Sequence, residues 1–268
     1  MIIDFHTHCF PDVLAPRALS RLSASAGSQP LTDGTVAGTV RAMTTRGIDL
    51  SVVCNIATNP HQMEKVNDFA IAVNDYSPRL IALGSLHPDA TPSELERQLD
   101  HLCDHDIRGV KVHPEYAGYY IDEAPWRRLF AAVNERGMFL VTHAGLDFIS
   151  PDRIAVTPAR LARVLDDLPT LRVVAAHLGG VCLWNEVREH LCGRDNLYFD
   201  TAIVAREKIP PSLALDIIRT HGVDRILFGS DMPWSDPAVE RDFLRSLPLT
   251  EEELTAILGG NAERLLFQ

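Results

Sequence analysis

The feature that most constrains the fold of this chain is a regular alternation of short apolar runs with segments of helical spacing. The runs are rich in Val, Ile and Leu and are nearly continuous, without the strict apolar and polar alternation of half-exposed strands. Such runs are typical of parallel strands that are buried on both faces. We predict eight of these strands, at residues 2–8, 50–55, 80–85, 108–112, 138–142, 171–176, 196–199 and 225–228.

Helical segments separate most of these strands. We predict helices at residues 36–46, 62–76, 93–105, 125–136, 158–168, 183–191, 211–220, 237–247 and 251–266, the last one broken at Gly259 and Gly260. Eight β/α units in about 250 residues have the size of a TIM barrel. We therefore predict a single α/β domain over residues 1–268 with the fold of a TIM (β/α)8 barrel.

The first predicted strand ends in His6-Thr-His8. An open doubly wound sheet, the alternative fold, would usually carry a Gly-rich phosphate loop at this place. Because side chains alternate along a strand, we expect His6 and His8 on one face, with Asp4 on the same side. Two neutral imidazoles side by side form half of a zinc-type site. A three-residue pattern is weak evidence alone, so the other strand ends decide the interpretation.

Polar residues also close five other predicted strands, and the active site of a TIM barrel lies at the carboxyl ends of its strands. With the first strand, the set is His6, His8, Lys111, His113, His143, His177, Asp200 and Asp231. Imidazole and carboxylate ligands together suit zinc, and also iron, manganese or cobalt. We predict one divalent metal ion, zinc by preference, with a position open to water. The predicted ligands are His6, His8, His143 and Asp231, and His177 is expected beside them or facing the substrate.

Several strand-end residues allow two interpretations. Lys111 would bridge a second metal ion if it were carbamylated, with His177 as a further ligand, or it would be a plain cation that pairs with Asp200 or a substrate carboxylate. His113 either turns toward the pocket or caps a loop. Asp200 either orients a ligand or substrate, or caps the next helix. Trp184 and Trp234 follow strands and either line a substrate pocket or pack in the core.

These residues predict proton-transfer chemistry. A zinc-type ion lowers the pKa of bound water from ~15.7 towards ~7. Asp231 can accept a proton and later return it to a leaving group, and His177 can stabilise a developing oxyanion. This arrangement would hydrolyse a small-molecule amide, lactone or ester, or would decarboxylate a small aromatic or muconate-like acid without an oxidant.

Residues 11–34 form the least regular part of the sequence and are rich in Ser, Ala, Gly and Pro. Long insertions of this kind often act as lids over active sites. We therefore predict a segment of loop and helix that lies over the mouth of the barrel.

Six motifs resemble the amidohydrolase superfamily, and most of all its aminocarboxymuconate-semialdehyde decarboxylase-like branch, also called amidohydrolase 2. They are the segments 4–8, 109–114, 142–145, 176–180, 227–233 and 258–265, which read DFHTH, GVKVHP, THAG, AHLGG, LFGSDMP and LGGNAERL. The resemblance implies a distorted TIM barrel with one or two divalent metal ions at its mouth. For one ion it implies the ligands His6, His8, His143 and Asp231, with His177 as the catalytic imidazole.

The resemblance also bears on the reaction. The chain is shorter than most decarboxylases of this branch, and no obvious cluster of arginines faces a carboxylate; Arg17, Arg153 and Arg160 are weak candidates. Hydrolysis is therefore the favoured prediction and decarboxylation the alternative. Dimers are common in this branch, which allows a homodimer.

Charge and composition restrict the partners and the compartment. The net charge of −11 disfavours nucleic acid and anionic membranes as partners, so we predict a small-molecule substrate. The sequence suggests neither a signal peptide nor a membrane span. Its five cysteines have no Cys-x-x-Cys spacing and are expected to be reduced. We predict a cytoplasmic protein.

Overall fold

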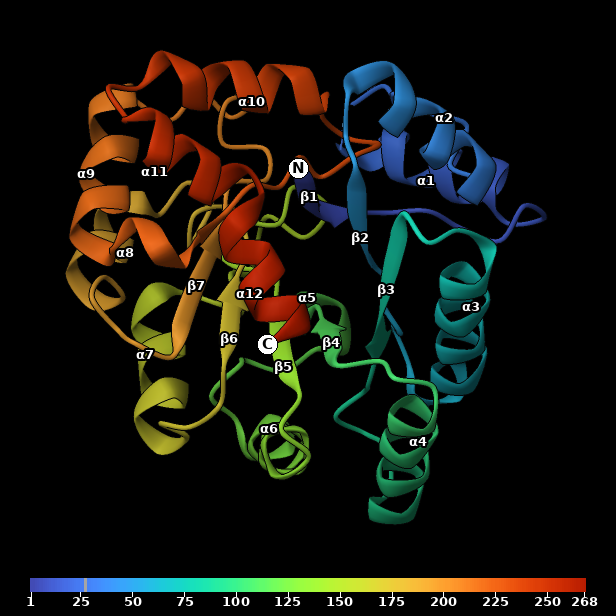
Figure 1. The fold of residues 1–268 in the computed structure, drawn as a ribbon. Helices are drawn as coiled ribbons and strands as arrows, with labels where there is room; N and C mark the ends of the chain where they lie inside the picture. The colour runs from blue at the N-terminus through green and yellow to red at the C-terminus, as the bar shows by residue number, and fades with distance from the viewer. Residues whose placement is uncertain (27) are drawn as a thin grey trace.

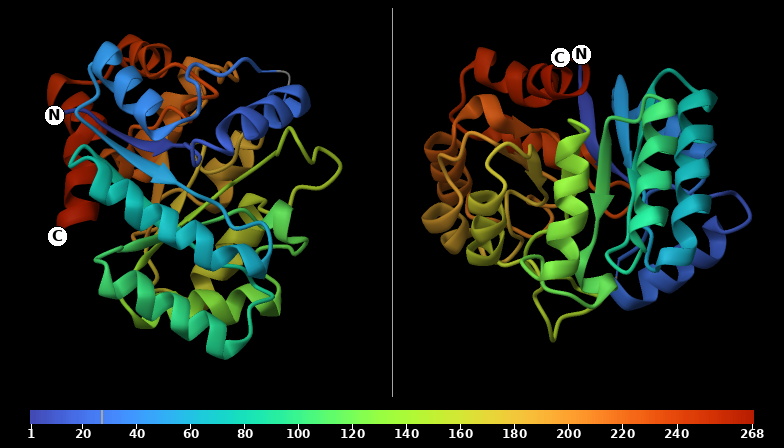
Figure 2. Two further views of the ribbon diagram at one scale, coloured as in Figure 1. Left: turned by 90° about the vertical axis from the view of Figure 1, so that its right-hand side faces the viewer. Right: turned by 90° about the horizontal axis from the view of Figure 1, so that it is seen from below.

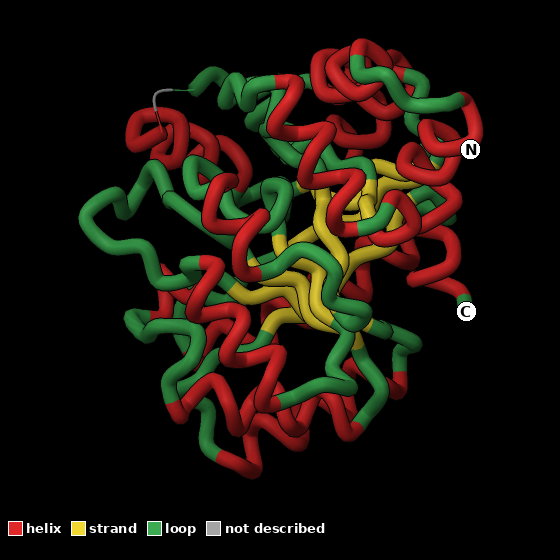
Figure 3. Tube along the Cα trace, turned by 90° about the vertical axis from the view of Figure 1, so that its left-hand side faces the viewer, coloured by secondary structure: helices red, strands yellow, loops and turns green. Residues whose placement is uncertain are grey.

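A computed structural model describes residues 1–26 and 28–268, with residues 25 and 26 described by their backbone alone. One sheet of eight parallel strands forms its centre, and each strand pairs with the next along the chain. Helices surround the strands (Figures 1 and 3). The predicted single-domain TIM barrel and its eight strands are confirmed. The strands are β1 (Ile3–Thr7), β2 (Leu50–Cys54), β3 (Leu80–Ser85), β4 (Gly109–Val112), β5 (Phe139–Thr142), β6 (Val173–Ala175), β7 (Leu197–Asp200) and β8 (Ile226–Leu227).

The barrel closes between β1 and the segment that follows β8. The amide of Phe5 donates to the carbonyl of Phe228 (2.8 Å), and the amide of Asp231 donates to the carbonyl of His6 (2.8 Å). These bonds place the last residues of β1 beside Asp231, although the two segments lie at opposite ends of the sequence.

Strand β1 contains a bulge that determines where its histidines point. Its register with β2 shifts between Asp4 and Thr7, where β1 has one residue more than its partner. Phe5 packs in the barrel interior, and the next residue, His6, also faces inward and lines the cavity above, together with His8. Bulges often re-aim side chains next to active sites in this way. Asp4 precedes the bulge and points away from the cavity, so its expected alignment with the two histidines does not hold.

The helices lie outside the barrel, with α3 and α4 side by side along its wall (Figure 2). Nearly all of them begin and end within two residues of the predicted bounds. They are α1 (Ala15–Ala26), α2 (Val36–Arg46), α3 (Met63–Tyr76), α4 (Pro92–Asp104), α5 (Pro114–Ala117), α6 (Ala124–Glu135), α7 (Pro158–Asp167), α8 (Trp184–His190), α9 (Pro211–His221), α10 (Pro237–Ser246), α11 (Glu251–Thr255) and α12 (Asn261–Phe267), with 3-10 turns η1 (Pro60–Gln62) and η2 (Val223–Arg225).

Two helical regions differ from the prediction. The short helix α5, directly after β4, was not expected. The predicted break at Gly259 and Gly260 is wrong, because a π-helical turn, η3 (Ala256–Gly260), joins α11 to α12 without interruption. A side chain at Gly259 would have its Cβ 2.3 Å from the carbonyl oxygen of Met1. Glycine at this position therefore lets the start of the chain pack against the turn.

The core has an inner and an outer part. The outer part lies between the strands and the surrounding helices. The inner part fills the barrel and joins residues of β1, β2, β3, β5, β6 and β8 to Ala262, Leu265 and Leu266 of α12. Helix α12 thus covers one end of the barrel, and the polar strand ends lie at the other. Across the described residues, no helix has the length and apolar character needed to span a membrane.

Candidate metal centre and active site

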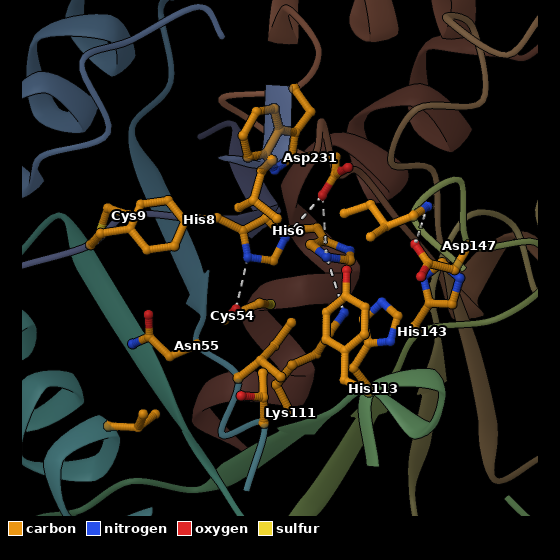
Figure 4. Close-up of a pocket in the computed structure, with 18 of the residues that line it drawn as sticks. His6, His8, Cys9, Cys54, Asn55, Lys111, His113, His143, Asp147 and Asp231 are labelled. Carbon is orange, nitrogen blue, oxygen red and sulfur yellow. Dashed lines mark hydrogen bonds and ion pairs between the residues drawn. The ribbon is translucent and has the colours of Figure 1, made fainter. Parts of the chain in front are cut away.

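His6, His8 and Asp231 turn their side chains toward one another at the carboxyl end of the barrel (Figure 4). Oδ1 of Asp231 lies 3.0 Å from Nε2 of His8 and 3.5 Å from Nε2 of His6. Atoms that share a zinc-type ion at ~2.1 Å are about 3.0–3.4 Å apart. The three side chains are therefore close enough to bind a common ion.

Both histidines are oriented through their other ring nitrogen. Nδ1 of His6 donates to Oδ2 of Asp200 (2.8 Å), and Nδ1 of His8 donates to the carbonyl oxygen of Cys54 (2.8 Å). An acceptor at Nδ1 fixes the proton there and leaves the lone pair of Nε2 free. Nε2 is the nitrogen that faces Asp231 in each ring, so both rings present the atom that a metal ion needs.

Burial keeps His6 neutral, whereas contacts with the histidines keep Asp200 and Asp231 charged. Burial, followed by the charge of Lys111, lowers the pKa of His6 to about 4. Burial alone would raise the pKa values of Asp200 and Asp231, but contacts with His6 and His8 outweigh it and hold both pKa values well below the usual range. Neutral imidazoles and ionised carboxylates are the protonation states that bind metal ions.

Asp231 is held in a left-handed backbone conformation, with φ of 69°. The carboxylate of Asp4 fixes the preceding residue, because it accepts bonds from the amide (2.8 Å) and the hydroxyl (2.5 Å) of Ser230. Burial outweighs these bonds and raises the pKa of Asp4 to about 7. Strained residues of this kind persist where the surroundings over-determine them. Asp4 therefore supports Asp231 from behind.

His177 and His143 face each other beside this cluster. Nε2 of His177 lies 3.1 Å from Nδ1 of His143. The backbone amide of His177 donates to Asp200 (2.9 Å), its Nδ1 donates to the carbonyl of Ala202 (3.1 Å), and its carbonyl accepts the indole N–H of Trp184 (3.0 Å). His177 is thus held at four points.

His143 differs from the other predicted ligands in its neighbours. It offers one ligand atom within 4.8 Å of those of His113 and Glu115, whereas the cluster formed by His6, His8 and Asp231 does not include it. Burial lowers the pKa of His143 well below its ordinary value. The structure thus gathers three of the four predicted ligands around one point, with the fourth beside them.

Lys111 extends from β4 into the barrel and is only 1% exposed. Its Nζ lies 3.0 Å from Nε2 of His6, the nitrogen that also faces Asp231. A metal ion at Nε2 would replace this hydrogen bond, and the ammonium would then lie next to the ion. Lys111 is placed for either predicted role, as a modified ligand or as a cation beside the substrate.

A cavity of about 610 Å³ opens above these residues. Its walls are mainly apolar and include the aromatic side chains of Phe10, Phe69, Phe148 and Trp234. The segment 11–34 contributes Pro11, Leu14 and Leu22. Three cationic side chains line the cavity, namely Lys111 at its base, Lys65 and Arg206. A largely apolar cavity with a few polar groups at one end is the usual form of a small-molecule site.

The predicted pocket residues fall into two groups. His113 and Trp234 line the cavity. Asp200 and Trp184 lie behind it, where they bond to His6 and His177. Of the arginines considered, Arg160 is held away from the cavity by Asp122.

The sequence did not indicate that Glu115, Lys65 or Arg206 belong to the site. Glu115 is the third residue after β4, and this place close to a strand end was the one signal for it in the sequence. Lys65 and Arg206 come from a helix and a loop, and no periodicity of the sequence indicates that they line the cavity.

The donor set fits a divalent metal ion. His6 and His8 each present a neutral Nε2, Asp231 presents a charged oxygen, and two buried acceptors orient the histidines from behind. Nε2 of His143 is buried and lacks a hydrogen-bond partner among the residues described. Three nitrogen and oxygen ligands with room for water are typical of catalytic zinc-type sites.

A comparison with protein-family models decides the family. The model described as amidohydrolase, of the amidohydrolase-2 type, matches residues 3–268. The chain belongs to the amidohydrolase family. This confirms the resemblance inferred from the sequence motifs. A search of curated proteins found no significant match.

Solved structures share the fold of this amidohydrolase over nearly its full length. An uncharacterised TIM-barrel protein from Bordetella bronchiseptica is 23% identical, with a TM-score of 0.75 and coverage of 99% of this chain and 98% of the other. A 5-carboxyvanillate decarboxylase from Novosphingobium aromaticivorans, with bound manganese, is 15% identical, with a TM-score of 0.73 and coverage of 100% and 97%. A 2,6-dihydroxybenzoate decarboxylase from Rhizobium is 15% identical, with a TM-score of 0.72 and coverage of 99% and 98%.

Proposed function

We propose that this amidohydrolase is a metal-dependent decarboxylase of a small aromatic carboxylic acid that carries a ring hydroxyl. The observation that carries the proposal is the cavity, whose aromatic walls and the cations Lys65 and Arg206 lie above the cluster formed by His6, His8 and Asp231. Two of the similar structures are decarboxylases of hydroxylated benzoates, and this likeness supports the same reaction class here.

The cations of the cavity favour decarboxylation over hydrolysis, the two reactions predicted from the sequence. Hydrolysis was favoured partly because no arginine cluster for a carboxylate was evident in the sequence. Arg206 and Lys65 both line the cavity, and each can pair with a carboxylate. Phe69 and Phe148 can pack against an aromatic ring. The cavity therefore suits an aromatic acid better than a neutral amide or lactone.

We assign the metal ion to His6, His8 and Asp231, with His143 next to them. A bound divalent ion would supply a positive charge that polarises substrate oxygens. Zinc and manganese both accept imidazole and carboxylate ligands, and a metal analysis of the purified protein would distinguish them.

Asp231 would carry out the proton transfers, with His177 beside it in the cavity. The low pKa of Asp231 keeps its carboxylate ionised, and in this form it would accept a proton from the substrate hydroxyl or from water once a bound ion had made that proton more acidic. It then delivers this proton to the ring carbon, whose bond to the carboxylate breaks as CO2 leaves and returns the electron pair to the ring. His177, whose Nε2 lies 3.1 Å from Nδ1 of His143, lines the same cavity and would pack against the bound substrate.

The test is a comparison of two substrate classes with metal-loaded protein. Hydroxybenzoates such as 2,6-dihydroxybenzoate should release CO2, and in D2O the product should carry one deuterium at the carbon that lost the carboxylate. Asp231→Asn should slow this release about 10²–10⁴-fold, while the exposed control Asp242→Asn should keep the wild-type rate. Turnover of lactones or amides without CO2 release from any aromatic acid would refute the proposal in favour of hydrolysis.

A further inference from the structure

A buried glutamate, Glu240, joins the two loops that bring Arg206 and Trp234 into the cavity. It lies in the first turn of α10, and its exposed fraction is 0%. Residues 201–210 follow β7 and contribute Arg206, and residues 228–236 follow β8 and contribute Trp234. Glu240 itself lies behind the cavity wall, so any effect on a bound ligand must pass through these loops.

The carboxylate of Glu240 accepts three hydrogen bonds from the two loops. Oε2 accepts the amide of Ala205 (2.8 Å), and Oε1 accepts the amide of Arg206 (3.2 Å). Oε1 also accepts the hydroxyl of Ser235 (2.7 Å), the residue after Trp234. Glu240 therefore fixes the stretch of backbone from which the side chain of Arg206 extends.

An ionised carboxylate suits these three donors because its oxygens carry lone pairs and no hydrogen. A glutamine of the same size would turn its NH2 group toward at least one of the donors. Burial opposes the charge and raises the pKa of Glu240 to about 7 in spite of the three bonds. An apolar residue would avoid this penalty, so the acid at this position indicates that the bonds it accepts have a function.

The loop that carries Arg206 is bent at two residues other than glycine. Ile203 and Lys208 have left-handed φ values of 57° and 58°. Residues in this conformation persist where their surroundings hold them. Within the loop, the amide of Glu207 donates to the carbonyl of Ile203 (2.8 Å). The bonds to Glu240 tie this bent loop to helix α10.

The side chain of Arg206 is held less firmly than its backbone. Its Nε lies 3.5 Å from a carboxylate oxygen of Glu207, and 28% of the side chain is exposed. A partly exposed ion pair of this length adds little free energy, so the guanidinium is available to a ligand in the cavity that it lines. Its direction therefore depends on the backbone that Glu240 fixes.

We propose that Glu240 is a positioning residue that directs the guanidinium of Arg206 toward the carboxylate of a bound aromatic acid. The inference rests on the proposed function in one respect, which is the contact between Arg206 and the substrate carboxylate. It adds that a residue outside the cavity determines the strength of this contact. A neutral ligand of the same shape should therefore bind equally well with or without the Glu240 carboxylate.

The test compares benzoate with benzamide, a neutral ligand of similar size, by isothermal titration calorimetry of metal-loaded protein at pH 8. Benzoate lacks the ring hydroxyl that the proposed reaction needs, so it stays intact. Arg206→Ala should weaken benzoate binding about 10–100-fold, and Glu240→Gln should weaken it at least about threefold without a change in benzamide binding. The control Asp242→Asn, at an exposed position of the same helix, should bind both ligands like the wild type.

A double variant tests whether the two residues act through one contact. Arg206→Ala combined with Glu240→Gln should bind benzoate no more weakly than Arg206→Ala alone. Circular dichroism melts verify the fold of each variant. Ser235→Ala removes one of the three donors and is a milder probe, with the same expected pattern, should Glu240→Gln not fold.

Three results would overturn the inference. They are unchanged benzoate binding in a folded Glu240→Gln, equal losses for benzoate and benzamide, and losses that add in the double variant. In the last two cases Glu240 would only stabilise the cavity as a whole. A wild type that prefers benzoate but releases no CO2 from any hydroxybenzoate would refute the proposed reaction and leave this inference standing.

Discussion

Replacement of Asp200 by Asn should weaken metal binding without a direct change to any ligand. The carboxylate of Asp200 accepts three hydrogen bonds, from Nδ1 of His6 (2.8 Å) and from the amides of His177 (2.9 Å) and Ala202 (3.1 Å). Oδ1 accepts both amides, and Oδ2 accepts the imidazole. An asparagine oxygen at Oδ1 would keep the two amide bonds, and its NH2 group would then face His6.

The expected loss of metal affinity follows from the tautomer of His6. Two donors cannot face each other, so the ring proton would move from Nδ1 to Nε2, the nitrogen that faces Asp231. Metal binding would then have to displace that proton or leave the introduced side-chain amide poorly paired. Loss of such an orienting partner typically reduces metal affinity 10–100-fold, which corresponds to about 1.4–2.7 kcal/mol.

The assay is a competition titration of zinc or cobalt against a chromogenic chelator at pH 7. A suitable control is Asp68→Asn, which removes an aspartate that bonds to His101 (2.9 Å) on the protein surface. We expect Asp68→Asn to bind metal like the wild type. An Asp200→Asn protein that is folded and has an unchanged dissociation constant would refute the role of Asp200 in orienting His6.

Three further predictions concern the metal, the cavity and the pH dependence. Removal of the metal by a chelator should lower the melting temperature, since an ion at a free concentration 100 times its dissociation constant adds about 2.7 kcal/mol to the free energy of unfolding. In thermal melts of His8→Ala, the chelator should change the melting temperature much less. Arg206→Ala should raise KM for an aromatic acid in steady-state assays more than it lowers kcat, and an unchanged KM would exclude a contact with the carboxylate. Burial raises the pKa of Glu240 to about 7, despite its bonds to Ala205, Arg206 and Ser235. Between pH 4.5 and pH 7 the folded state therefore holds a proton on Glu240 that the unfolded state has lost. The wild type should lose stability relative to Glu240→Gln as pH rises through this range. If the melting temperatures of the two proteins changed equally with pH, this reasoning would be contradicted.

The barrel could be predicted from the sequence because its strands are buried on both faces and read as continuous apolar runs. The meeting of His6, His8 and Asp231 followed from the fold, since parallel strands end at one rim. The contact of Asp4 with Ser230 and the burial of Glu115 beside His113 could not be predicted. Their positions depend on contacts with residues that are distant in the sequence or on the path of a loop, and neither leaves a periodic signal.

The bulge in β1 separates prediction from structure most clearly. Strict alternation correctly placed His6 and His8 on one face but wrongly added Asp4, because the register of β1 depends on the length of its partner strand. A pattern within one strand carries no information about an extra residue opposite its neighbour.

The same bulge makes the first strand unusually sensitive to changes in length. Phe5 belongs to the apolar core inside the barrel, and His6 lines the cavity at the metal centre. Two adjacent residues of the chain therefore belong to the core and to the active site. Deletion of one residue between Asp4 and Thr7 would restore regular pairing with β2 and would shift the side chains that point inward. Either an imidazole would then lie in the apolar core, or a phenylalanine ring would lie in the metal centre. A substitution in this strand affects either the metal centre or the packing beneath it, whereas a single-residue insertion or deletion would disrupt both together.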